Sequence, residues 1–154
     1  MNTSSINILI ADDDEDDALL IAEALQDNLP SCNCIHTTDG VSTLRYIKTH
    51  DTPDLVFLDI NMPFKDGITC LKDIHNHNLL PSTPILICST SQNMRDIKVA
   101  DEFGATLYIV KPSTFNQFNK IITRAIDLLG EPKTRKTDKS SFVLREPKMF
   151  DLYN

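Results

Sequence analysis

Apolar residues in this chain are grouped in two ways, as short runs and as longer stretches with helical spacing. Five short runs predict strands: INILIA (6–11), CNCIHT (32–37), DLVFLD (54–59), PILICS (84–89) and TLYIV (106–110). The stretches between and after these runs repeat apolar residues every three or four positions and predict helices: 18–29, 41–50, 68–77, 94–104 and 113–130. Strand and helix therefore alternate five times.

This alternation predicts an α/β fold. Near-continuous apolar strands separated by amphipathic helices indicate a parallel sheet that is covered on both faces. Because crossovers between parallel strands are right-handed, we expect a doubly wound, flavodoxin-like (βα)5 three-layer sandwich with strand order 2-1-3-4-5. Polar residues mark the helix ends: Asp13 or Asp14 is expected to cap the first helix, Ser113 or Thr114 the last, and Gly104 to end the fourth.

The C-terminal residues differ in composition from the rest of the chain. We assign residues 1–130 to one domain and 131–154 to a tail that is too short to be an output domain. The tail begins with a basic, polar stretch that contains Lys133, Arg135, Lys136 and Lys139. The Phe142–Leu144 cluster is a short apolar run within the tail. We expect a solvated linker with one hydrophobic anchor, and a contact between the basic stretch and a partner remains an alternative.

Charge and hydropathy exclude several classes of protein. The formal net charge of −7 argues against general nucleic-acid binding, which needs clustered Lys and Arg. The start of the chain lacks a basic segment, and its apolar run is too short for a signal peptide. Since no run approaches the roughly 18 apolar residues of a membrane span, we expect a soluble, cytoplasmic protein without membrane contact. The four cysteines are expected to be reduced thiols.

Carboxylates gather where two neighbouring strands are predicted to end. Asp12 and Asp13 follow the first strand and Asp59 ends the third, so the three should converge in one crevice. Two like charges about 4 Å apart repel by roughly 4 kcal/mol at an effective dielectric constant near 20. A cation should therefore occupy the crevice, and hard oxygen ligands suit Mg²⁺. Lys111, at the end of the fifth strand, would supply a second positive charge.

Other interpretations of the acidic run at 12–17 remain open at this point. The run could be a solvated acidic turn, since charge runs are commonly solvated. A flavin-phosphate site is disfavoured because six consecutive acids would repel a phosphate. A dinucleotide site is disfavoured because no G-x-G-x-x-G follows the first strand. Asp16 and Asp17 lie beyond the strand end and are expected to contribute little to metal binding.

Four segments together resemble the receiver domains of two-component response regulators. They are LIADDDEDD (9–17), DLVFLDINMPFKDG (54–67), PILICSTS (84–91) and GATLYIVKP (104–112), in the family's order and spacing. The resemblance covers about residues 6–129 and implies a stand-alone receiver. It implies that Asp59 is the phosphoacceptor. It also implies that Asp13 binds Mg²⁺ directly, that Asp12 lies largely in the outer coordination shell of the ion, and that Asn61 offers its backbone carbonyl to the metal.

The resemblance also implies roles around the phosphoryl group. Ser89 corresponds to the switch hydroxyl, Tyr108 to the switch aromatic and Lys111 to the lysine that pairs with the phosphoryl oxygens; the Lys111–Pro112 bond corresponds to one that is usually cis. Ser89 would move toward the phosphate and vacate space for Tyr108. The alternatives are a Ser89 hydroxyl that bonds the backbone and a half-buried Tyr108 with its hydroxyl in water. Thr90 departs from the Ala that many members carry.

These roles imply a phosphorylated signalling module and not an enzyme. Its expected partners are a sensor histidine kinase or a histidine phosphotransfer protein, together with an unknown downstream protein. An adaptor that uses the fold without phosphorylation is less favoured, because such proteins typically lose the acid pair, the phosphoacceptor or the lysine. A phosphatase with an Asp nucleophile is less favoured because Asn61 stands where its second acid would be.

Overall fold

The computed structural model describes residues 5–130 and 142–146. The strands are β1 (Asn7–Ala11), β2 (Asn33–Thr37), β3 (Leu55–Leu58), β4 (Ile85–Ser89), β5 (Leu107–Val110) and β6 (Val143–Leu144). The helices are α1 (Glu15–Asn28), α2 (Gly40–Thr49), α3 (Gly67–Asn76), α4 (Met94–Glu102) and α5 (Phe115–Leu129). All ten predicted elements are present, and β6 is an addition.

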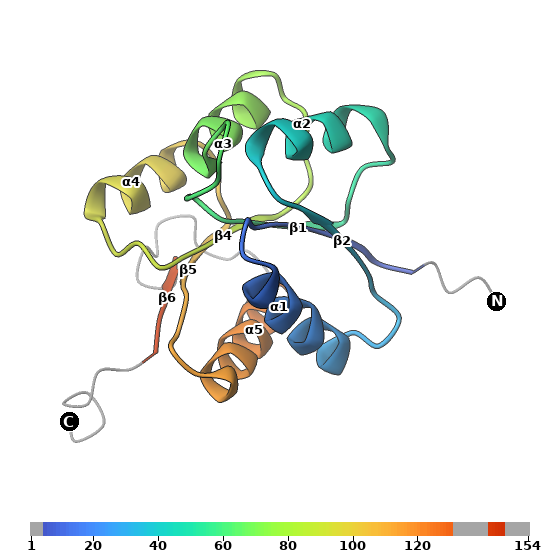
Figure 1. Ribbon diagram of the computed structural model, residues 1–154, viewed down its shortest axis with the longest axis vertical. Coiled ribbons are helices and arrows are strands. Elements are labelled where there is room, and N and C mark those ends of the chain that lie inside the picture. The colour runs from blue at the N-terminus through green and yellow to red at the C-terminus, as the bar shows by residue number, and fades with distance from the viewer. Residues whose placement is uncertain (1–4, 131–141, 147–154) are drawn as a thin grey trace.

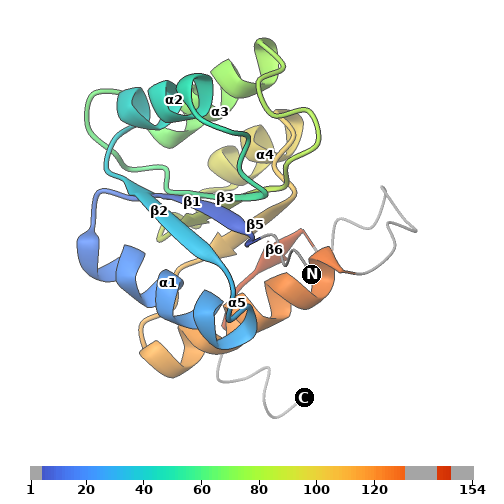
Figure 2. The same cartoon turned by 90° about the vertical axis from the view of Figure 1, so that its right-hand side faces the viewer.

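The strands form one parallel sheet between two layers of helices. Its order is β2-β1-β3-β4-β5-β6, so the predicted order of the first five strands is confirmed. Helices α1 and α5 cover one face, and α2, α3 and α4 cover the other (Figures 1 and 2). This is the doubly wound α/β sandwich that the alternating pattern predicted.

The central strands are apolar at every position because both of their faces are covered. All residues of β3, β4 and β5 are buried. Neighbouring residues point to opposite faces, so Val56 and Leu58 join the apolar layer under α2, α3 and α4, whereas Leu55 and Phe57 join the layer under α1 and α5. Burial on both faces fixes the register of each strand in the sheet. The register in turn fixes the position of the residue that follows the strand.

Helix α1 begins earlier than its apolar pattern indicated. Asp14 is the N-cap, and its carboxylate accepts hydrogen bonds from the amides of Asp16 and Asp17 at 2.9 and 3.2 Å. The acidic residues Glu15, Asp16 and Asp17 therefore form the first turn of the helix, where negative charge is favourable. This placement gives each acid a fixed direction, which a flexible acidic loop would not.

The Phe142–Leu144 cluster returns to the body of the protein as a sixth strand. The amide of Tyr108 donates to the carbonyl of Phe142 at 2.8 Å, and Tyr108 pairs with Val143 in the ladder. Val143 packs on the apolar layer under α2–α4 and Leu144 on the opposite layer. The expected hydrophobic anchor is confirmed, and it also covers the edge of β5. The basic stretch with Lys133, Arg135, Lys136 and Lys139 lies outside the described residues.

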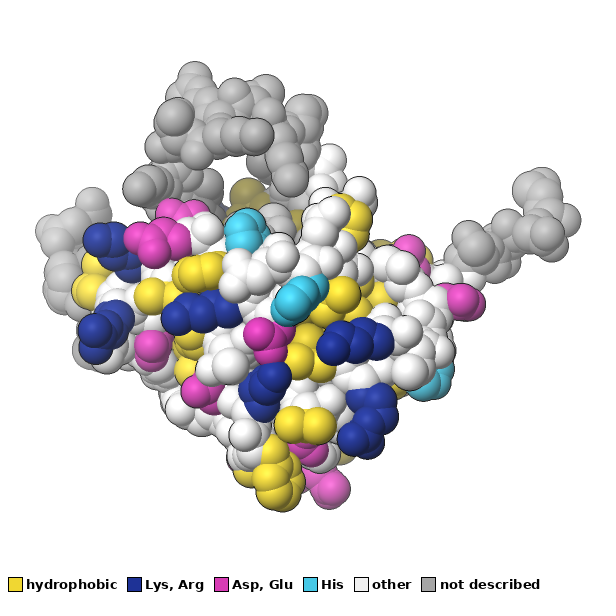
Figure 3. All heavy atoms as spheres, turned by 90° about the horizontal axis from the view of Figure 1, so that it is seen from above, with side chains coloured by type: hydrophobic (Ala, Val, Ile, Leu, Met, Phe, Trp, Pro, Cys, Tyr) yellow, Lys and Arg dark blue, Asp and Glu magenta, His cyan; other side chains and the backbone are white. Residues whose placement is uncertain are grey.

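The outer face of α2, α3 and α4 has a mixed surface. In Figure 3, Lys and Arg side chains on this face are interspersed with acidic, apolar and histidine side chains and do not form a continuous stripe. Within residues 5–130 and 142–146, no helix combines the length and the apolar character needed to cross a bilayer.

Candidate functional site

The candidate site lies at the carboxyl ends of β1, β3, β4 and β5. Ala11 pairs with Leu58 in the ladder between β1 and β3, and the amide of Asp59 donates to the carbonyl of Ala11 at 2.9 Å. The next residue on each strand is an aspartate, Asp12 or Asp59. The sheet register therefore places these two carboxylates side by side, as the sequence predicted.

Three predicted metal ligands come together at this edge. Carboxylate oxygens of Asp12, Asp13 and Asp59 all lie within 4.8 Å of one another. Asp12 is 1% exposed and Asp59 is 5% exposed, whereas Asp13 is exposed to solvent. The cluster thus has two buried members and one member that faces outward.

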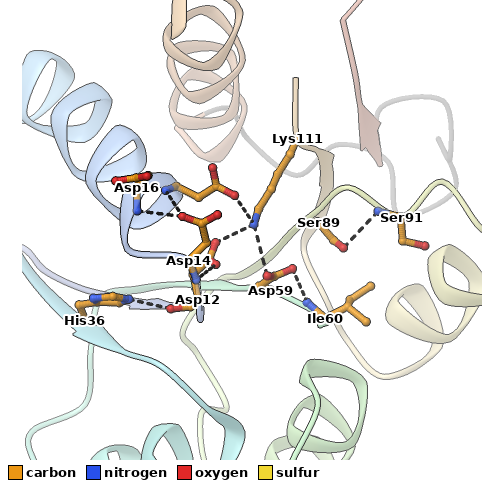
Figure 4. Close-up of polar contacts among 10 residues, drawn as sticks. Asp12, Asp14, Asp16, His36, Asp59, Ile60, Ser89, Ser91 and Lys111 are labelled. Atoms are coloured by element: carbon orange, nitrogen blue, oxygen red, sulfur yellow. Dashed lines mark hydrogen bonds and ion pairs between the residues drawn. The ribbon is translucent and has the colours of Figure 1, made fainter. Parts of the chain in front are cut away.

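Lys111 closes the site from the β5 side (Figure 4). Its Nζ lies 2.8 Å from Asp12 Oδ2, 3.0 Å from Asp17 Oδ2 and 3.3 Å from Asp59 Oδ2, and its side chain is 5% exposed. Its amide donates to the carbonyl of Ser89 at 2.8 Å, which ties the ends of β5 and β4 together. The Lys111–Pro112 bond is trans and not cis as the resemblance implied; trans is the generally favoured form of such bonds.

Burial and charge shift the pKa values of the central pair. Burial raises the pKa of Asp59 to about 6; Lys111 opposes this effect and Asp12 adds to it. Burial alone would lower the pKa of Lys111, but its contacts with Asp12, Asp59 and Asp17 outweigh burial and raise that pKa above its ordinary value. Lys111 is therefore a permanent cation, and Asp59 is a carboxylate whose negative charge is only partly compensated.

The buried acid Asp12 has one oxygen whose partner in the described residues is the Lys111 ammonium. Asp12 Oδ1 accepts from the amide of Asp14 at 2.9 Å, and His36 Nε2 lies 2.7 Å from the Asp12 carbonyl oxygen. Asp12 Oδ2 has Lys111 as an ion-pair partner at 2.8 Å, but it makes no hydrogen bond of good geometry. Three carboxylates within 4.8 Å of one another, with one ammonium among them, fit a hard divalent cation such as Mg²⁺.

The loop after Asp59 is held tightly against the strand end. The Asp59 Oδ1 atom accepts from the amide of Ile60 at 2.8 Å, which orients the carboxylate. Gly67 packs so closely that a Cβ there would lie 1.9 Å from the carbonyl oxygen of Asp59. Asn61, in the same loop, is exposed next to the acid cluster. Its proposed carbonyl contact with a metal remains a prediction.

Comparisons with known proteins agree with this geometry. Residues 8–123 match the response regulator receiver domain. This chain belongs to that family. Receivers are signalling domains of two-component systems and not enzymes in the usual sense.

Relatives of this receiver include proteins of which it covers most of the length and proteins of which it covers a part. The glycerol metabolism activator of Pseudomonas putida is 31% identical over 87% of this chain and 61% of that protein. Rcp1 of Synechocystis is 26% identical over 75% of this chain and 82% of Rcp1. The chain spans 17% of the sensor histidine kinase CheAY of Helicobacter pylori. It therefore corresponds to one part of some relatives and to most of others.

Solved structures of similar receivers share the fold. The phosphorylated cyanobacterial phytochrome response regulator RcpA matches with a TM-score of 0.76 and 27% identity, covering 81% of this chain and 94% of RcpA. The CheX–CheY–BeF3–Mg²⁺ complex of Borrelia burgdorferi matches with a TM-score of 0.67 and 27% identity, covering 82% of this chain and 90% of the matched one.

The predicted switch residues of this receiver lie on the other side of Asp59. Ser89 is fully buried, and its Oγ accepts from the amide of Ser91 at 3.2 Å. Tyr108 is also fully buried, and its hydroxyl donates to the carbonyl of Ser91 at 2.8 Å. The alternative of a half-buried Tyr108 with its hydroxyl in water is therefore wrong. Thr90, which departs from the family pattern, is exposed between the two serines.

Sequence reasoning missed Asp17. It placed Asp17 with Asp16 beyond the strand end and expected both to contribute little to metal binding, but the Asp17 carboxylate is one of the three that contact Lys111. The signal that could have found it is the N-cap at Asp14, since capping there starts α1 early enough to turn Asp17 toward the β5 side. Uncertainty about whether Asp13 or Asp14 caps the helix concealed this direction.

Proposed function

We propose that this receiver accepts a phosphoryl group on Asp59 and transmits the signal through protein contacts. The donor is a phosphohistidine on a sensor histidine kinase or a histidine phosphotransfer protein, or a small phosphodonor. The observation that carries the proposal is the convergence of Asp59, Lys111 and the acid pair at the carboxyl edge of the sheet. Positioning and charge neutralisation are the main requirements of phosphoryl transfer.

In the proposed step, a carboxylate oxygen of Asp59 attacks phosphorus, and the bond from phosphorus to the donor breaks: the P–N bond of a phosphohistidine, which leaves as histidine, or the P–O bond of acetyl phosphate, which leaves as acetate. The hydrogen bond from Ile60 to Oδ1 and the contact from Lys111 to Oδ2 fix the direction of the carboxylate. Lys111 remains protonated and compensates the negative charge that arrives with the phosphoryl group. The product is an aspartyl phosphate with additional acceptor oxygens.

Asp12, Asp13 and Asp59, with the Asn61 carbonyl, are the groups that would hold Mg²⁺. When bound, the ion supplies positive charge that offsets the carboxylates and the phosphoryl oxygens. Two observations support this assignment. The three carboxylates lie within 4.8 Å of one another, and the similar Borrelia CheY complex contains Mg²⁺ together with BeF3.

The signal is proposed to leave through the face formed by α4, β5 and α5. The Ser89 Oγ accepts from the Ser91 amide, and its own proton remains available to be donated to a phosphoryl oxygen, which would draw residues 89–91 toward the phosphate. Tyr108 is bonded to the carbonyl of Ser91, so movement of residues 89–91 reaches Tyr108 directly. Because Tyr108 pairs with Val143, the proposed output face of this receiver also includes β6. A downstream protein would dock on this composite surface.

The test is intact-mass measurement after incubation with acetyl phosphate. With Mg²⁺, the wild-type chain should gain one phosphoryl mass, and the gain should fall sharply with EDTA. Asp59→Asn should abolish the gain, whereas Asp51→Asn, which changes an exposed acid outside the site, should be labelled like wild type. Stoichiometric labelling of Asp59→Asn, or none of the wild-type chain, would show that Asp59 is not the acceptor.

A further inference from the structure

The Asp17 carboxylate contacts the site but has no part in the phosphoryl transfer described above. Asp17 Oδ2 lies 3.0 Å from Lys111 Nζ, and its side chain is 27% exposed. The carboxylates placed to hold a metal are those of Asp12, Asp13 and Asp59, and Asp17 is not among them. Asp17 is therefore a partner for Lys111 that metal binding leaves in place.

The local structure directs Asp17 and its neighbour to different places. The Asp14 cap fixes both residues in the first turn of α1. Successive residues on a helix face directions about 100° apart. Asp17 meets Lys111, whereas Asp16 is exposed and its side chain points away from Lys111 (Figure 4). The two acids carry the same charge in the same turn, so Asp16 provides a matched comparison.

We propose that Asp17 is a positioning residue. It competes with Asp59, the phosphoacceptor, for the ammonium of Lys111 and so helps to set the position of that ammonium. Before phosphorylation, it shares the ammonium with Asp12 and Asp59, which weakens the hold of Lys111 on their oxygens and leaves them more available to a metal. After phosphorylation, it competes with the phosphoryl oxygens for the same ammonium. This inference rests on the proposed function of Asp59.

The first consequence concerns metal binding. Without the Asp17 charge, Lys111 relies on Asp12 and Asp59 alone, and it competes more strongly with a cation for their oxygens. Removal of a nearby negative charge also lowers the attraction of the site for any cation. Both effects have the same sign, so Asp17→Asn should weaken Mg²⁺ binding even though Asp17 is not itself placed as a ligand.

The second consequence concerns the affinity for a phosphoryl mimic, which should rise where the affinity for Mg²⁺ falls. Once Mg²⁺ is saturating, the incoming group is an anion, and loss of Asp17 removes both its competitor for Lys111 and a source of repulsion. A phosphoryl mimic should therefore bind more tightly to Asp17→Asn than to wild type. A substitution that merely loosens the fold would weaken both ligands together, so the opposite signs are diagnostic of positioning.

The experiment is titration calorimetry on the full chain with two probes. The first is Mg²⁺ alone, and the second is beryllofluoride at saturating Mg²⁺. For Asp17→Asn we expect the Kd for Mg²⁺ to rise about three- to tenfold and the Kd for beryllofluoride to fall about two- to fivefold, as suits a partly exposed charge. Asp16→Asn loses the same helix-end charge and should change both constants by less than about twofold. Asp17→Glu should restore Mg²⁺ affinity toward wild type.

The possible failures are distinguishable. If Asp17→Asn behaves like Asp16→Asn, or if both ligands weaken in parallel, the positioning role is wrong and the phosphoacceptor assignment stands. If the wild-type chain binds Mg²⁺ but is neither labelled by acetyl phosphate nor bound by beryllofluoride, the proposed function fails, and this inference fails with it.

Discussion

The two sides of Asp59 differ in charge and in hydrogen bonding. On the α1 side, the carboxylates of Asp12, Asp17 and Asp59 contact the Lys111 ammonium, and Asp13 adds a fourth negative charge to the cluster. On the α4 side, which we call the neutral side, the two switch hydroxyls of Ser89 and Tyr108 both bond the backbone of Ser91. A charged group on this side is the Asp96 carboxylate, which accepts from the Ser91 hydroxyl at 2.8 Å. We therefore expect added positive charge to be favourable on the first side, and we expect the proposed phosphoryl group to act on the second side through the Ser89 hydroxyl.

This difference separates binding from signalling. Buried like charges make the acid side unfavourable when nothing is bound, so a cation relieves repulsion that already exists. The neutral side is a set of hydrogen bonds to the Ser91 backbone, each of modest net strength. A small local change can then bias it, as a two-state switch requires. Substitutions on the acid side should alter affinities most, and those on the neutral side should alter coupling.

The largest effect is expected on the acid side, from Asp13→Asn. This change removes an exposed carboxylate from the cluster that is placed to hold a metal. We expect the Kd for Mg²⁺ to rise by about 10- to 100-fold, which is about 1.4–2.7 kcal/mol. Calorimetry would measure it, with Asp16→Asn as the control. A change smaller than that of Asp17→Asn would mean that Asp13 is not a ligand.

A moderate effect is expected on the stability of the metal-free protein. Burial raises the pKa of Asp59 to about 6 in the folded state. The folded state therefore binds this proton more tightly than the unfolded state does. The ionised form therefore costs stability fully above about pH 7, and this cost disappears as the pH falls toward 4. In EDTA at pH 7.5, Asp59→Asn should be more stable than wild type by about 1–3 kcal/mol.

Thermal denaturation with EDTA at pH 7.5 and at pH 4.5 would measure this difference. The advantage of Asp59→Asn should shrink at the lower pH, because the wild-type Asp59 is then mostly protonated. Asp51→Asn, an exposed acid, serves as the control. If Asp59→Asn were more stable than wild type by the same amount at both pH values, the ionised Asp59 carboxylate would not be the source of the instability.

The smallest effect on binding, but the largest on coupling, is expected from Ser89→Ala. Lys111 and the acid cluster are retained, so acetyl phosphate should still label the variant at a reduced rate. In wild type, beryllofluoride with Mg²⁺ should change amide hydrogen exchange at 59–67, 89–95, 108–113 and, through its pairing with β5, 142–144. In Ser89→Ala, only the 59–67 response should persist. A wild-type response confined to 59–67 would show that the neutral side is not a switch.

Much of the fold could be predicted because its signals are local. Continuous apolar runs identified five strands, and residues such as Asp39, Asp66 and Thr114 mark helix starts through caps that act within three residues. The β6 strand could not be predicted in this way. Its two residues carry no alternation of their own, and Val143 and Leu144 form a strand only because the edge of β5 offers unpaired backbone groups.

The site was predictable to the extent that it follows strand ends. Asp12, Asp59 and Lys111 come directly after buried strands, and any parallel sheet in this order brings such residues to one edge. The state of Tyr108 was not predictable, because whether its hydroxyl reaches Ser91 depends on packing between β4, β5 and α4. The resemblance to receivers predicted a role for Tyr108, but it did not predict the conformation of the Tyr108 side chain.

The sequence by itself determined the five βα units, their order and the identity of the residues at the carboxyl edge, because periodicity and strand length are properties of short segments. Only the tertiary structure decided which charges meet. Asp16 and Asp17 are adjacent acids that sequence reasoning treated as equivalent, and a helix rotation of about 100° between them separates a solvated carboxylate from one held 3.0 Å from Lys111. Electrostatic energy depends on distances between side chains that are far apart in the chain, and those distances exist only once the layers have packed.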